Sequence, residues 1–372
     1  MSFGITNRIN IFNKKKIIQG NYIYDPSFAN QIFTKTGEGN FSNLNISNNG
    51  LELTATTKTT VGKLYSSSNN GGIVSEERTA VDGRQFHCSA SDFSLIYFPQ
   101  SSSNYLRKTL SESFGSGRTT ILFNTEKMVC SKNGLALLSN KDYANETSAV
   151  VAIQIFDTGS TTWADLTQPV PVYRGNIPQY YVIPTAMAVS SESNTNYIAM
   201  VIYETTPARI YIITSSSVTG ADSNTWTLYN FNKRDAKEVA LTNISNNVVT
   251  AFIACGGSTN PGLWKMTFNR TDNNTTRTTN LNNSSYFTNI TPNALDNVFQ
   301  SVAVSTDGNY IVASSTTKIY CSRDGGSIWN VCANYPAISI ALSEKGHHAM
   351  IATNSTGNTS LYNFLRLSRP IT

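Results

Sequence analysis

The chain has 372 residues, of which 40% are hydrophobic and 14% are charged, and its formal net charge is +5. The hydrophobic share is enough for a core, whereas the charged share is well below the roughly 25% of an average domain, and Asn, Ser and Thr fill the gap. The small, scattered positive charge argues against a nucleic-acid binder, and no apolar run reaches the roughly 18 residues of a membrane span. Such a neutral polar surface suits a protein that packs among copies or faces solvent.

The first 43 residues precede the repeated part of the chain, and we expect them to form a short N-terminal arm. Residues 1–24 are basic and weakly resemble an organelle transit peptide, but an ordinary basic arm is the simpler interpretation. No long apolar segment of a secretory signal follows them. Aromatic residues between positions 21 and 33 provide apolar surface that can pack on, or complete, the last repeat. An open ring would expose unpaired strand edges, so we expect the two ends of the chain to meet.

A strand–turn–strand unit recurs seven times over the rest of the chain. In each unit, a short strand of small and β-branched residues ends in Ser or Thr, a polar turn follows, and an apolar strand returns. A spacing of roughly 40–50 residues is typical of propeller blades with four antiparallel strands. The sequence therefore predicts an all-β fold, a seven-bladed β-propeller in one domain over residues 44–372. The strand-ending residues are Ser47, Ser89, Ser131, Ser190, Thr242, Ser305 and Ser343.

The most complete repeat, over residues 301–332, contains a turn with a recognisable pattern. The order of Ser322, Asp324, Gly326 and Trp329 resembles the Asp-box, or BNR repeat, of sialidase-type propellers. This copy has Ile328 where that family prefers Thr or Ser, and the copies around Asp157 and Asp222 are degenerate. In that family the Asp caps backbone N–H groups, the glycines supply positive φ, and the Trp packs under the hairpin. The resemblance implies a fold and four structural residues, and it leaves the function open.

Catalysis of the sialidase type, as the same resemblance implies it, needs three arginines for the substrate carboxylate, a Tyr–Glu nucleophile pair and an acidic Asp. The family's arginine motif normally precedes the first Asp-box, but residues 21–43 contain no arginine. The nearest matches are Arg174 and the group Tyr203, Glu204 and Arg209, which we interpret as strand-end residues. We therefore expect no catalytic residue and no cofactor.

Neither the histidines nor the cysteines are spaced as metal ligands, so we expect no metal site. His347 and His348 lie where a turn meets a strand, and we expect both to be solvated. Cys321 and Cys332 flank the Asp-box turn and are close enough in sequence to pair across the hairpin. Because the cysteine count is odd and no secretory signal is visible, we expect reduced, half-buried thiols and folding in a reducing compartment. Composition alone then accounts for the numerous Asn-x-Ser/Thr sequons.

Two classes of function fit these patterns. The first is a non-enzymatic structural or attachment module with protein partners in a larger assembly, for example on the surface of a virion. The second is a sialidase-like glycoside hydrolase, and a carbohydrate-binding lectin lies between the two, since 18 Tyr and 17 Phe provide stacking surfaces for a glycan. We favour the first because the charge is low, the arginine motif is missing and the arm can dock elsewhere.

Overall fold

The fold is all-β. The computed structural model describes residues 33–38, 41–48, 52–57, 63–67, 75–79, 88–91, 93, 96–101, 104–108, 118–119, 124–134, 136–142, 150–155, 185–193, 196–203, 208–214, 227–231, 235–257, 260–269, 286–346, 348–354 and 360–366. Within these ranges the regular structure is strand, and they contain no helix long and apolar enough to cross a membrane.

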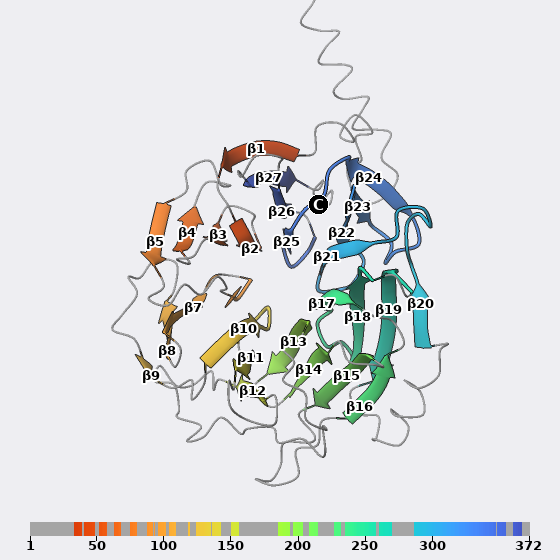
Figure 1. Cartoon of the computed structure of the whole chain (residues 1–372). Helices are drawn as coiled ribbons and strands as arrows, with labels where there is room; N and C mark the ends of the chain where they lie inside the picture. The colour runs from red at the N-terminus through yellow and green to blue at the C-terminus, as the bar shows by residue number, and fades with distance from the viewer. Residues whose placement is uncertain are drawn as a thin grey trace, which may run out of the picture.

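The strands of the described residues form seven antiparallel sheets, which Figure 1 shows arranged in a ring. The first sheet contains β2 (Phe41–Ile46), β3 (Leu53–Thr57), β4 (Lys63–Ser67) and β5 (Ser75–Thr79). The second contains β6 (Cys88–Ser89), β7 (Ile96–Ser101), β8 (Asn104–Lys108) and β9 (Arg118–Thr119). The third contains β10 (Asn124–Cys130), β11 (Ala136–Asp142) and β12 (Val150–Ile155), three strands among the described residues. The fourth contains β13 (Ala186–Ser193), β14 (Asn196–Tyr203), β15 (Ala208–Thr214) and β16 (Thr227–Phe231).

The remaining three sheets continue the same order around the ring. The fifth contains β17 (Ala236–Leu241), β18 (Val248–Cys255), β19 (Gly262–Asn269) and β20 (Phe287–Asn289). The sixth contains β21 (Phe299–Val304), β22 (Ile311–Ser315), β23 (Ile319–Ser322) and β24 (Trp329–Ala333). The seventh combines β25 (Ser339–Leu342), β26 (His348–Asn354) and β27 (Ser360–Arg366) with β1 (Phe33–Glu38) from the other end of the chain.

The two ends of the chain meet in the seventh sheet. Strand β1 pairs with β27 in antiparallel register, with Phe33 opposite Leu365 and Glu38 opposite Leu361. The strand expected from residues 20–43 is therefore present and lies at the outer edge of the last sheet. The expected end of the arm at residue 43 falls inside β2, because β2 already begins at Phe41. Residues 1–32 lie outside the described part of the chain.

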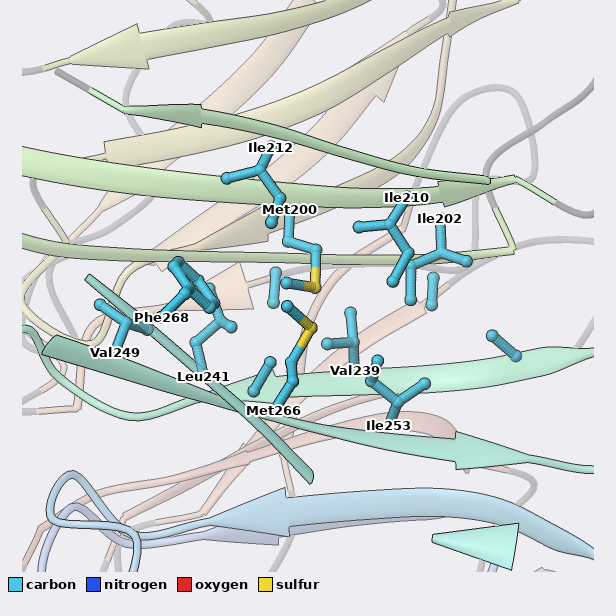
Figure 2. Packing of buried hydrophobic residues seen from close by; sticks show 14 of the residues in the cluster. Met200, Ile202, Ile210, Ile212, Val239, Leu241, Val249, Ile253, Met266 and Phe268 are labelled. Atoms are coloured by element: carbon cyan, nitrogen blue, oxygen red, sulfur yellow. The ribbon is translucent and has the colours of Figure 1, made fainter. Parts of the chain in front are cut away.

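Among the described side chains, clusters of buried apolar residues join the fourth sheet to the fifth, the fifth to the sixth, the sixth to the seventh and the seventh to the first. The middle strands of the fifth, sixth and seventh sheets are therefore buried on both sides. Between the fourth and fifth sheets, Met200 and Met266 approach each other among isoleucine, leucine and valine side chains (Figure 2). The alternate positions of β14 and β18 are buried as well, for example Val201 and Phe252. This double burial explains why these strands read as continuous apolar runs instead of alternating patterns.

One hydrogen-bonding motif recurs where the innermost strand of a sheet ends. A side-chain hydroxyl at this point accepts a hydrogen bond of 2.9–3.0 Å from a backbone N–H at or near the start of the next strand. The residues that provide the hydroxyl are Ser47, Thr242, Ser305 and Ser343. The sequence repeat therefore corresponds to a structural one at these four positions. In the second sheet the equivalent position is Ala90, one residue after the expected Ser89, because β6 extends through Ser89 before the turn begins.

Candidate functional site

The Asp-box-like turn between β23 and β24 is held by the Asp324 carboxylate. Asp324 Oδ1 accepts hydrogen bonds from the backbone N–H of Ile328 at 2.9 Å, the N–H of Ser327 at 3.0 Å and the Ser322 hydroxyl at 2.9 Å. Slight burial raises the pKa of Asp324, but the hydrogen bonds from Ile328, Ser322 and Ser327 outweigh it and lower the pKa below its ordinary value. All of the contacts described for this carboxylate are made within its own turn.

The other residues of the motif complete the same turn. Gly325 and Gly326 have φ of 70° and 94°, a conformation that residues with a side chain rarely adopt. A Cβ on Gly326 would come within 2.8 Å of Ile290. The indole N–H of Trp329 donates to the Gly326 carbonyl at 3.0 Å, and the ring packs against the core between the fifth and sixth sheets. The motif thus joins the outer hairpin to the neighbouring sheet.

A second set of turns forms a connected rim around one end of the ring. At four junctions a backbone N–H in one turn donates to a carbonyl of the next, from Asn48 to Ser91, from Ser91 to Lys132, from Asn243 to Thr306 and from Thr306 to Glu344. The rim continues back to the first sheet, because the Glu344 N–H donates to Asn48 Oδ1 at 3.1 Å and Asn48 Nδ2 donates to the Glu344 carboxylate at 2.7 Å. These bonds tie adjacent sheets together where their inner strands end.

The space inside the ring is a cavity of about 550 Å³, lined by residues from the innermost strand of all seven sheets. Its wall mixes aliphatic residues such as Leu44, Val239 and Ile340 with polar and charged ones, and it includes cysteine and methionine residues. A volume of this size is within the range of small-molecule sites.

Lys132 reaches across this cavity from the third sheet to the sixth. Its ammonium donates to the Val304 carbonyl at 2.7 Å. Burial lowers the pKa of Lys132 to about 8, although the negative charges of Glu344 and Asp307 act in the opposite direction. A partly buried cation therefore stands at the end of the cavity that the rim surrounds.

Two further carboxylates connect elements. Glu238 Oε2 on β17 accepts the Val302 N–H at 2.9 Å and the Ser301 hydroxyl at 2.5 Å, which joins the fifth sheet to the sixth. Asp296 Oδ2 accepts three hydrogen bonds of 2.8 Å, from the hydroxyl groups of Ser315, Thr317 and Tyr320. These bonds anchor the loop before β21 to the sixth sheet. Sequence reasoning singled out neither of these acids nor Lys132, because their partners are distant in the chain.

Of the residues weighed for sialidase chemistry, the described structure places the backbones of Tyr203 and Arg209 alone. Arg174 and Glu204 lie outside the described residues, as do Asp157 and Asp222 of the degenerate motifs. Tyr203 and Arg209 face each other in register between β14 and β15. Their side chains are likewise outside the described part.

Two expectations from the sequence are wrong. Cys321 and Cys332 form a disulfide with Cα atoms 6.3 Å apart, and both are buried, not half-buried and reduced. The pairing follows from register: Cys321 lies opposite Asn330, so Cys332 is its diagonal neighbour on the same side of the hairpin. The bond removes one observation on which the expected reducing compartment rested. His348 is 6% exposed and not solvated, because it is already the first residue of β26, and its N–H donates to Ser343.

No family model and no curated protein matches the chain. Among solved structures, hydrazine synthase from Kuenenia stuttgartiensis is similar, with a TM-score of 0.56 and 9% sequence identity over 88% of this chain and 96% of that chain. A likeness at this level of identity shows the fold alone and carries no information about activity.

Proposed function

We propose that the chain is a seven-bladed β-propeller that serves as a non-enzymatic binding or structural module in a larger assembly. Three features support the propeller: the ring of seven antiparallel sheets, the cavity lined by every innermost strand, and the pairing of β1 with β27. Propellers of this kind keep their strand edges short and protected, and one sheet built from both chain ends serves that purpose.

The observation that carries the functional proposal is the use of acidic side chains within the scaffold. Asp324 and Asp307 each accept hydrogen bonds inside their own turns, and Glu238, Asp296 and Glu344 join one segment to another. A glycoside hydrolase needs two carboxyls facing a common substrate, about 5–10 Å apart. Carboxylates that accept hydrogen bonds from backbone N–H and hydroxyl groups instead stabilise a rigid surface, which favours binding over turnover.

A larger assembly, such as the surface of a virion, fits the low charge and the neutral polar composition. Exposed apolar residues at the outer edge of the sixth sheet give such an assembly a contact surface. Ile328 is 67% exposed, and Val331 and Tyr335 lie close by in the chain and are also exposed. Glycan binding is the alternative ligand class, with aromatic side chains as the stacking surface.

The test is a comparison of turnover with binding in the purified full chain. We expect no hydrolysis of a fluorogenic sialoside, and retention of a protein partner that weakens when Ile328 is replaced by Ser. Ser327→Ala, on the same turn, is the matched control for the apolar contact. Sialoside hydrolysis that disappears in Arg174→Ala or Arg209→Ala would establish an enzyme and refute the proposal. Glycan binding without hydrolysis would instead identify a lectin.

A further inference from the structure

Two thiols from neighbouring sheets face the same cavity. Cys88 lies on β6, the innermost strand of the second sheet, and Cys130 ends β10, the innermost strand of the third. Both are free cysteines, and both line the central cavity. Strands β6 and β10 contact each other, and the two thiols are close enough to interact electrostatically. Cys88 is buried, whereas Cys130 is partly exposed and so can be reached from the cavity.

The surroundings of the pair contain further soft donors. The thioether residues Met128 and Met187 line the same cavity, whose wall otherwise mixes aliphatic with polar side chains and includes the charged residues Lys132, Lys237 and Glu238. Thiolate and thioether sulfur bind soft metal ions such as Cu(I) in preference to hard cations. A monovalent ion of this class needs only two sulfur ligands, which is the number of thiols that the two sheets bring together.

We propose that Cys88 and Cys130 bind one soft monovalent metal ion, of the Cu(I) or Ag(I) class, within the central cavity. Both thiols lose their protons on binding, so the metal with two thiolates carries one net negative charge. Lys132 lines the same cavity two residues after Cys130, and its ammonium provides a compensating positive charge. The ion would cross-link the second and third sheets.

The other cysteines provide internal controls. Cys321 and Cys332 are bonded to each other and offer no thiol. Cys255 is buried and outside any disulfide, but it packs between the fourth and fifth sheets and does not line the cavity. A Cys255→Ser variant therefore removes one thiol without touching the proposed site.

The experiment is a titration of the purified full chain with Ag(I), without oxygen, chloride or added reductant. We expect one tightly bound Ag(I) per chain by elemental analysis, retained in Cys255→Ser and lost in Cys88→Ser and in Cys130→Ser. Alkylation of the native wild-type protein, read by peptide mass spectrometry, gives a test that needs no variant. Bound Ag(I) should protect Cys130 from the reagent.

Three results would overturn the proposal: no retained silver in the wild type, equal retention in the Cys130→Ser variant, or alkylation of Cys130 that silver leaves unchanged. A fourth is a peptide pair linking positions 88 and 130 with a mass lower by two hydrogen atoms. That mass would mean that the thiols serve as a disulfide, having lost two protons and two electrons to an oxidant, and not as metal ligands.

Discussion

Replacement of Asp324 by Ala should measure how much the Asp-box-like turn contributes to stability. Three hydrogen bonds end on Asp324 Oδ1, two of them from backbone N–H groups. Each is worth about 0.5–1.5 kcal/mol net, and water replaces part of this at an exposed turn. We expect a loss of about 1–2 kcal/mol, comparable to removing a side chain that caps a helix. At an unfolding entropy of about 2.1 cal/mol/K per residue, the melting temperature should fall by about 1–3 °C.

The pH dependence of the same variant separates the charge from the hydrogen bonds. The pKa of Asp324 is lower in the folded chain, so its contribution to stability is complete above the unfolded pKa of about 4. That contribution is lost as the pH falls through the lower, folded pKa. Asp324→Asn keeps an acceptor oxygen, so it should lose less stability than the alanine variant and lack this acid-dependent part. Urea unfolding between about pH 3 and pH 7 measures both effects. An alanine variant as stable as wild type at every pH, or one that abolishes ligand binding without losing stability, would refute the structural role.

Two other changes have effects set by the structure. Gly346→Ala places a Cβ within 2.4 Å of Tyr310 at a φ of +71°, so it should lower the free energy of unfolding by about 2 kcal/mol or more. Gly325→Ala has a similar φ of +70°, but its Cβ would lie 3.4 Å from the nearest neighbour. It should lower the free energy of unfolding by about 1 kcal/mol in the same melting assay. Equal losses would mean that the contact with Tyr310 is unimportant. Reduction of the Cys321–Cys332 bond, which closes a loop with a separation of 11 residues, should cost on the order of 3 kcal/mol, and unchanged melting in dithiothreitol would contradict this.

The repeat could be recognised in the sequence because it depends on turn-forming residues that are close together in the chain. The Ser-x-Asp-Gly order predicts a turn wherever it occurs, and Ser305 and Ser322 both begin such turns in the structure. The end of the second-sheet strand was misplaced by one residue because Ser89, a residue typical of turns, still pairs with Ile96 in β6, and the turn begins at Ala90. The disulfide was missed because cysteine count and compartment gave a weaker indication than strand register, which only the paired strands reveal.

The cavity and its rim could not be predicted in the same way. Lys132 sits in an ordinary polar turn, and its bond to the Val304 carbonyl joins residues that are 172 positions apart. Glu238 and Ser301 are 63 positions apart. Such contacts depend on how the sheets close around the axis, and no pattern within a single repeat contains that information.

Closure of the ring through β1 and β27 is the feature on which the proposed scaffold depends most. Amide hydrogen exchange, followed by mass spectrometry on the full chain and on a variant lacking residues 1–38, tests it directly. In the full chain, residues 360–366 should exchange slowly, because β27 is paired on one side with β1 and on the other with β26. Removal of β1 should accelerate exchange in this segment and lower the melting temperature. Equal exchange in residues 360–366 of the two proteins, with unchanged melting, would show that β1 does not close the ring.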